Sequence, residues 1–211
     1  MEVPLEPRVV RHPLAAEKLT RMRDATTGRE QFRSLMDELS SFLVYEALRD
    51  LPTDDIDVTT PVGLAPGVQL QDPPLVVPVL RAGLGMLNPA LRLLPNAGVG
   101  FVGLRRNEAT FEPDPYLTTV PDQLGGRSAL VLDPMLATGG SMAHTCQLLA
   151  AHGAGHLTVV CVLAAPEGIA RLAATGLDID VVTGAIDERL NDTAYIVPGL
   201  GDAGDRLYGD I

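Results

Sequence analysis

The chain has 211 residues, of which 46% are hydrophobic and 20% charged, a composition typical of one folded domain rather than of a disordered chain. Its net charge of −11 and pI near 4.7 oppose nucleic-acid binding, and it has no Trp for stacking bases. No apolar run approaches the roughly 20 residues of a membrane span and the charged start does not resemble a signal peptide, so we expect a soluble cytoplasmic protein without membrane or nucleic-acid partners.

The first predicted element is an amphipathic helix over residues 28–50. Thr27 and Glu30 have the spacing of a capping box, and Pro52 lies just beyond the predicted end. Apolar side chains recur at helical spacing at Phe32, Leu35, Met36, Leu39, Phe42 and Leu43. This stripe predicts packing rather than a site.

Residues 53–73 predict an exposed hairpin arm, because prolines and glycines separate short β-type fragments. The acidic residues Asp54, Asp55 and Asp57 favour a solvated loop over a cation site, since no neighbouring residues complete an oxygen cage.

Apolar strands and helices alternate over residues 74–183, the predicted α/β core. We expect strands over 75–80, 99–104, 129–132, 157–163 and 179–182, and helices over 84–94, 141–151 and 167–175. This alternation indicates a parallel sheet covered on both faces, which binds ligands beyond the carboxyl ends of its strands. Cys146 and Cys161 fall within these elements and are expected to be reduced thiols in the core.

The most informative run follows the strand over 129–132. It reads Asp133, Pro134, Met135, Leu136, Ala137, Thr138, Gly139, Gly140 and Ser141, and a helix follows it. A helix N-terminus offers unpaired N–H groups and a partial positive charge, which attract phosphate, and Asp133 is placed to reach the hydroxyls of a sugar. Taken alone, the same pattern also fits a simple turn with a capping carboxylate.

Arginines follow two other predicted strands. Arg81 comes after residues 75–80, and Arg105 and Arg106 come after residues 99–104. One arginine at a strand end is usually a surface ion pair, but in a parallel sheet these residues and Asp133 meet at one edge. Guanidinium groups suit phosphates, so the arrangement predicts a site for more than one phosphate.

Residues 195–205 contain three glycines and one proline, and we expect neither helix nor strand there. The segment is too apolar for an ordinary solvent loop. Its backbone groups could pair with a flat ligand that carries alternating donors and acceptors, or the segment could be a structural C-terminal turn.

The chain resembles the uracil phosphoribosyltransferases almost from end to end. The motifs that carry the resemblance are residues 79–86, Arg106-Asn107-Glu108, 113–116, 133–141, 164–168 and 198–205. It implies a type I phosphoribosyltransferase fold: one α/β domain over residues 1–211, with a central parallel sheet flanked by helices, a β-arm and a small hood over residues 184–211. It also implies transfer of ribose 5-phosphate from phosphoribosyl pyrophosphate (PRPP) to N1 of uracil, with Mg²⁺ carried by PRPP rather than by a metal site of the protein.

The resemblance also implies roles for individual residues. Residues 133–141, Arg81, Arg106 and Asp202 match positions that bind PRPP, and Arg81, Arg106, Asp133 and Asp202 are the expected catalytic set. Ile196, Gly201, Asp202 and Ala203 match positions that hold uracil. We choose Arg106 over Arg105 because Arg106 directly precedes Asn107-Glu108. Homo-oligomers and activation by GTP occur in the family, although no GTP site can be placed on this sequence.

The single acidic residue in Asp133-Pro134 favours the uracil enzymes, since most type I phosphoribosyltransferases have two adjacent acidic residues there. Two alternatives share the fold: an RNA-binding regulator of pyrimidine genes, and a non-catalytic nucleotide-binding module. The acidic charge opposes the first, and the complete set of Arg81, Arg106, Asp133 and Asp202 opposes the second.

Overall fold

The computed structural model describes residues 5–106 and 113–210. Its main-sheet strands are β1 (Arg8–Val9), β4 (Leu75–Leu80), β5 (Val102–Arg106), β6 (Pro113–Thr118), β7 (Ala129–Leu132), β8 (Met135–Leu136), β9 (Leu157–Ala164) and β10 (Ile179–Ile186). The helices are α1 (Pro13–Arg23), α2 (Arg29–Ala47), α3 (Leu84–Leu93), α4 (Gly140–Ala151), α5 (Pro166–Ala173) and α6 (Ala203–Tyr208). Two further strand pairs are β2 (Thr53–Thr60) with β3 (Gly63–Leu70) and β11 (Arg189–Leu190) with β12 (Ile196–Val197).

The main sheet has the strand order β1-β10-β9-β7-β4-β5-β6, and β8 also pairs with β9. All of its neighbouring strands run parallel except β5 and β6, which are antiparallel. The predicted central parallel sheet is therefore confirmed, with one antiparallel edge strand that the sequence pattern did not indicate. The carboxyl ends of β4, β7 and β9 lie side by side, as expected for a ligand-binding edge.

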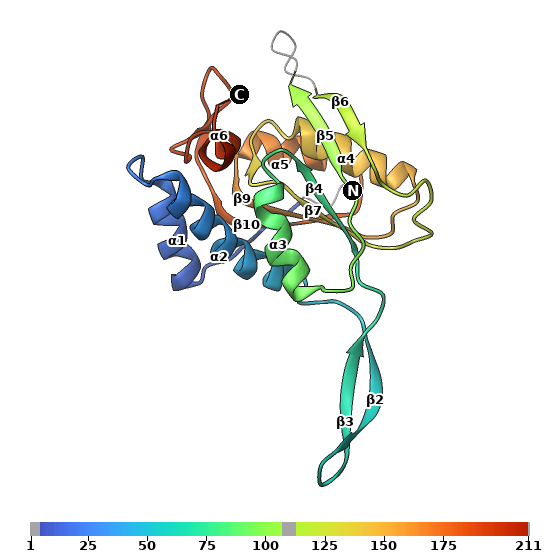
Figure 1. Ribbon diagram of the computed structural model, residues 1–211. Coiled ribbons are helices and arrows are strands. Elements are labelled where there is room, and N and C mark those ends of the chain that lie inside the picture. Colours follow the sequence, from blue (N-terminus) through green and yellow to red (C-terminus); the bar gives the residue numbers. More distant parts are fainter. Residues whose placement is uncertain (1–4, 107–112, 211) are drawn as a thin grey trace.

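Helices cover both faces of this sheet. Helices α1, α2 and α3 pack on one face, and α4 and α5 pack on the other (Figure 1). In β9, Val160 and Val162 join the first core, whereas Val159 and Cys161 join the second, because successive side chains of a strand point to opposite faces. Burial on both sides explains the continuous apolar strands. Cys146 and Cys161 are buried free thiols, as predicted.

The N-terminal region differs from the prediction in two respects. The long helix α2 begins after Gly28 and ends at Ala47, and no side chain caps it, so the predicted capping box at Thr27 is wrong. The Thr27 hydroxyl instead donates to the carbonyl of Arg21. Helix α1 was not predicted, although Pro at its first position is a known start signal.

Two boundaries nearer the site also differ. Strand β5 begins at Val102 rather than at Val99 and continues through Arg106, so both arginines belong to the strand instead of following it. Residues 195–205 were expected to contain neither helix nor strand, but β12 includes Ile196 and α6 begins at Ala203. The sequence pattern missed both elements because each is short.

The predicted hairpin arm is confirmed: β2 and β3 pair antiparallel from Thr53–Leu70 to Thr60–Gly63 and project away from the sheet (Figure 1). Among the described residues, no helix combines the length and apolar character needed to cross a membrane.

Candidate active site

A cavity of about 350 Å³ opens at the carboxyl edge of the main sheet. It gathers side chains from segments far apart in the sequence. Its lining includes Arg81, Leu104, Asp133, Met135, Ala137, Ser141, Ile196, Gly201, Asp202 and Ala203. Most of the predicted site residues thus meet in one place, which only the parallel alignment of β4, β5 and β7 makes possible.

The β7–α4 loop, residues 133–139, forms one wall of this cavity. Gly139 is the N-cap of α4 and has φ +76°, a conformation that favours glycine. A Cβ atom at Gly139 would lie 2.7 Å from the carbonyl oxygen of Gly168, and one at Gly168 would lie 2.5 Å from that of Ala137. Backbone therefore packs directly on backbone here, and this contact holds the α4 N-terminus against the edge of the sheet.

Pro134, Leu136 and Thr138, which were also predicted, are not among the residues of this loop that line the cavity. Leu136 is fully buried in the second core, and Pro134 is also buried. The Thr138 hydroxyl accepts a hydrogen bond of 3.4 Å from the Gly140 N–H. The first turn of α4, which includes Gly140 and Ser141, supplies the N–H groups that a helix leaves without partners of its own. This part of the loop therefore offers main-chain donors to an anion.

Asp133 lies at the end of β7 and is half-buried at the cavity wall. Its Oδ1 accepts a hydrogen bond of 3.3 Å from the Met135 N–H. Burial raises the pKa of Asp133 to about 7, with a smaller contribution from the negative charge of Asp202, although the Met135 hydrogen bond opposes the shift. Near neutral pH this carboxyl is therefore poised between its acid and its ionised form.

Arg81 and Asp202 complete the charged part of the cavity. The Arg81 Nη2 lies 3.6 Å from Asp205 Oδ1, and both side chains are well exposed. Asp202 is the N-cap of α6 and accepts a 2.9 Å hydrogen bond from the Asp205 N–H. The charge of Asp202 raises the pKa of Asp205. An exposed pair of this kind contributes little stability, so an anionic ligand can replace Asp205 at Arg81 at small cost.

Arg106 ends β5, and its side chain lies outside the described residues, as do Asn107 and Glu108. Five residues that line the cavity were not among the predicted site residues: Ala82, Leu104, Ala194, Tyr195 and Gly204. They adjoin Arg81, Arg105, Ile196 and Ala203, so extending each motif by one or two positions would have found them.

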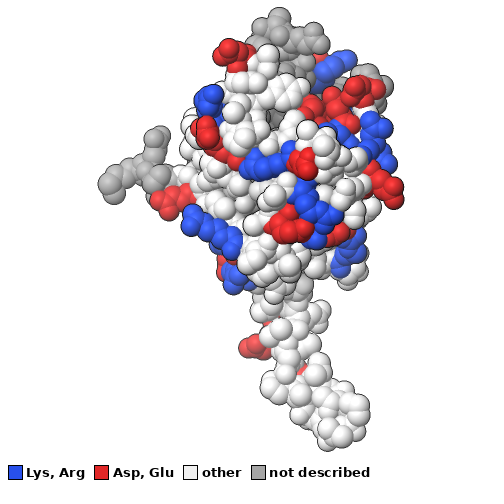
Figure 2. Space-filling model, turned by 90° about the vertical axis from the view of Figure 1, so that its left-hand side faces the viewer, with Lys and Arg blue, Asp and Glu red and all other residues white. Residues whose placement is uncertain are grey.

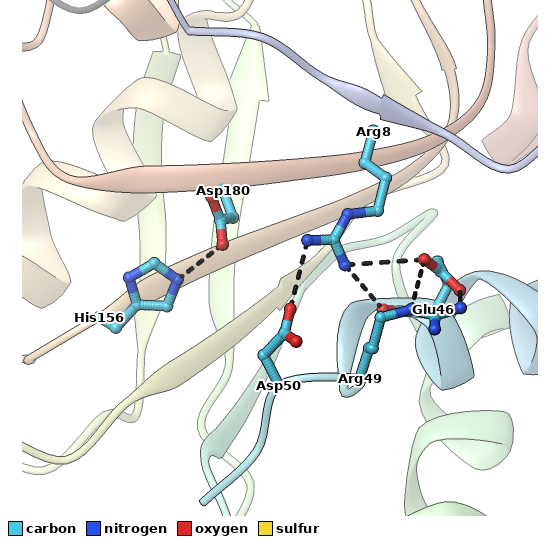
Figure 3. Close-up of polar contacts among 6 residues, drawn as sticks. All are labelled: Arg8, Glu46, Arg49, Asp50, His156 and Asp180. Atoms are coloured by element: carbon cyan, nitrogen blue, oxygen red, sulfur yellow. Dashed lines mark hydrogen bonds and ion pairs between the residues drawn. The ribbon is translucent and has the colours of Figure 1, made fainter.

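A second cavity of about 280 Å³ lies at the opposite edge of the sheet, where Arg8, Asp50, His156 and Asp180 contribute to its lining (Figure 3). These side chains contact one another in pairs. The Arg8 Nη2 atom lies 3.3 Å from Asp50 Oδ2, and the His156 Nε2 atom lies 3.1 Å from Asp180 Oδ2. Ligands of parallel sheets bind at the other edge, so the first cavity is the candidate active site.

The described residues contain no group of three or more His, Cys, Asp or Glu side chains that could hold a metal ion. In the first cavity, Asp133 and Asp202 are the carboxylates that line it. These two carboxylates are the groups lining the cavity that could contact a metal ion.

The fold is shared with solved phosphoribosyltransferases. The adenine phosphoribosyltransferase of Trypanosoma brucei superposes with a TM-score of 0.56 over 87% of this chain and 86% of that chain, at 16% identity. At that identity the likeness shows the fold alone. This is the type I phosphoribosyltransferase fold, and the cavity lies at the carboxyl edge of its sheet.

The chain belongs to the uracil phosphoribosyltransferase family. The model of that family matches residues 9–210. The uracil phosphoribosyltransferase of Corynebacterium diphtheriae is 55% identical over 205 residues, which cover 97% of each chain. A solved structure, the AQ2163 protein of Aquifex aeolicus, has a TM-score of 0.91 and 40% identity over 97% of this chain and 98% of that chain.

The raised pKa of Asp133 predicts a pH-dependent stability. Because the folded state binds this proton more tightly than the unfolded state does, the contribution of Asp133 to the free energy of unfolding should fall as the pH rises from about 4 to about 7. Asp133→Asn removes this titration, so the ligand-free variant should be more stable than the wild type at pH 8, by about 1–4 kcal/mol. Urea unfolding at pH 5 and pH 8 measures the difference. The exposed arm residue Asp55 provides the control Asp55→Asn, and an unchanged pH slope in Asp133→Asn would contradict the assignment.

Proposed function

We propose that this protein transfers the 5-phosphoribosyl group of PRPP to N1 of uracil, giving UMP and diphosphate. The proposal rests on one observation: in a chain of the uracil phosphoribosyltransferase family, one cavity is lined by Arg81, Asp133, Ser141 and Asp202. The same cavity has the β7–α4 loop on one side and the C-terminal segment on the other, so it offers separate surfaces to the sugar phosphate and to the base.

The donor PRPP is proposed to lie along the β7–α4 loop. The N–H groups at the start of α4, including those of Gly140 and Ser141, bind its 5-phosphate. Asp133 accepts hydrogen bonds from the ribose hydroxyls, and Arg81 and Arg106 bind the pyrophosphate. Mg²⁺ enters as the PRPP complex, and Asp202 faces the donor from the other side of the cavity.

Uracil is proposed to bind against the C-terminal segment. Ile196, Gly201, Asp202 and Ala203 line the cavity there. Gly201 has φ +81°, which turns the backbone at this point in a way that favours glycine. Main-chain N–H and C=O groups then alternate along the segment, which suits the alternating acceptors and donors of the uracil edge.

In the proposed reaction, the bond from C1 of ribose to the pyrophosphate oxygen breaks and uracil N1 forms a new bond to C1. The N1–H bond of uracil breaks as well, and its proton leaves to solvent. The ribose passes through a cationic state, and the pyrophosphate leaves with the electrons of the broken bond. Arg81 and Arg106 stabilise the charge of the leaving group, and the ionised form of Asp133 stabilises the cationic sugar. Holding both reactants in one cavity supplies much of the remaining acceleration.

Incubation with PRPP, Mg²⁺ and each of uracil, cytosine, orotate and hypoxanthine tests the proposed function directly. We expect diphosphate release and a nucleotide product with uracil alone. Turnover of another base in preference to uracil, or no turnover of any base, would contradict it. The same assay with added GTP tests whether GTP activates the enzyme, which we infer from the family.

The Arg106→Ala variant tests the role of the pyrophosphate-binding arginine. We expect kcat to fall by about 10²–10³-fold, the usual effect of removing one preorganised donor to the transition state. Arg105 is the matched control, because its Nη2 lies 3.6 Å from Asp114 Oδ2 and 72% of its side chain is exposed. Steady-state assays of both variants show which arginine binds the pyrophosphate. A larger loss of kcat in Arg105→Ala than in Arg106→Ala would assign this role to Arg105.

We also infer that the protein forms a homo-oligomer through the arm β2–β3. Residues 58–70 contain no charged side chain, and the outer part of the arm is white in Figure 2. Val62, Leu64 and Val68 are 98%, 78% and 66% exposed. An apolar projection of this kind suits burial against a second copy of the chain.

The double variant Leu64→Asp/Val68→Asp should therefore shift the protein to a smaller species. Both side chains lie on one face of β3, so two charges there oppose burial. Gln69→Asp adds a charge on the other face of the same strand and should leave the assembly intact. Sedimentation velocity reports the species, and a wild-type monomer, or an unchanged assembly in the double variant, would contradict the inference.

A further inference from the structure

Arg23 and Asp187 form an ion pair behind the C-terminal segment. Arg23 is the last residue of α1, and Asp187 directly follows β10. The two N–H···O contacts between them measure 2.7 and 2.5 Å, which makes the pair bidentate. Only 5% of the Asp187 side chain and 25% of the Arg23 side chain are exposed. Neither residue lines the active-site cavity.

The ion pair holds both backbone groups of Gly199. Asp187 Oδ2 accepts a 2.9 Å hydrogen bond from the Gly199 N–H, and Arg23 Nη1 donates a 2.8 Å hydrogen bond to the Gly199 carbonyl. The turn is tight, since Gly199 has φ +63° and a Cβ atom there would lie 2.1 Å from the carbonyl oxygen of Ile196. Two charged side chains therefore fix the orientations of the two peptide groups that flank Gly199.

Arg206 anchors the next residue of the same segment. It donates a 2.9 Å hydrogen bond to the carbonyl of Leu200, and its guanidinium lies 4.2 Å from the centre of the Phe32 ring. Its other hydrogen bonds go to the carbonyls of Met22, Asp24 and Thr27, at and beyond the end of α1. Residues 199 and 200 are thus tied to α1 immediately before Gly201 and Asp202 reach the cavity.

We propose that the Arg23–Asp187 pair is a positioning device for the base: it orients the main chain between Ile196 and Asp202 so that its N–H and C=O groups meet the uracil edge. This inference rests on the proposed function. Neither side chain touches substrate. Among the described residues, the side-chain hydrogen bonds of Arg23 and Asp187 go to each other and to Gly199, and none goes to the β7–α4 loop or to Arg81 on the donor side. Loss of the pair should therefore affect uracil much more than PRPP.

The Asp187→Asn variant tests this split. Removing the charge weakens the hold on Arg23 and on the Gly199 N–H, and a lost charge-assisted hydrogen bond corresponds to about 10- to 100-fold. We expect kcat/KM for uracil to fall by that factor, while KM for PRPP stays within about threefold of the wild type. Arg23→Lys keeps the positive charge but not the fork of donors, so its loss should be smaller than that of Arg23→Ala.

The Arg92–Asp37 pair supplies the matched control, since it is also bidentate, with contacts of 3.1 and 2.5 Å, but joins α3 to α2. Asp37→Asn should leave both KM values unchanged. Equal losses for uracil and PRPP, or no loss for uracil, would overturn the proposal. If circular dichroism shows that Asp187→Asn does not fold, the two Arg23 variants test the proposal instead. The loss of kcat/KM for uracil should be smaller in Arg23→Lys than in Arg23→Ala, and any other order would overturn the proposal. A wild-type protein that does not turn over uracil would refute the proposed function instead.

Discussion

The site depends on the close backbone contact between Gly139 and Gly168. Any side chain at either position would meet a carbonyl oxygen at less than 3 Å, so the loop after β7 and the start of α5 can approach only as glycines. This approach places the N-terminus of α4 at the carboxyl edge of the sheet, beside Asp133. The helix end proposed to bind the phosphate and the carboxylate proposed to bind the sugar are thereby held together without contributions from flexible side chains.

A protein with a net charge of −11 must bind a highly anionic donor through local groups. In the proposed site this requirement falls on Arg81, on the helix N-terminus and on Arg106, the last residue of β5. The carboxylates of Asp133 and Asp202 instead repel an anionic donor. Their mutual repulsion contributes to the raised pKa of Asp133. A metal cation that enters with the donor, or formation of a cationic ribose, would relieve that repulsion, so the same feature that costs stability in the free protein favours the proposed chemistry.

The sequence predicted the core of the fold because its strands are apolar along their whole length and its helices are amphipathic. It also predicted most of the cavity, because Arg81, Asp133 and the segment after Tyr195 each follow a recognisable element. It could not predict the pairing of β5 with β6, which depends on contacts formed only in the sheet, or the short helix α6. The Arg23–Asp187 pair was also missed, since its members are 164 positions apart and neither lies in a motif.

The most direct measurement is a crystal structure of the protein with PRPP and Mg²⁺. If the α4 N-terminus is the anion site, the 5-phosphate oxygens will lie within hydrogen-bonding distance of the main-chain N–H groups of residues 138–141, and the ribose hydroxyls will contact Asp133. A donor bound elsewhere, for example in the cavity beside Arg8 at the opposite edge of the sheet, with the α4 N-terminus left to solvent, would contradict the central assignment.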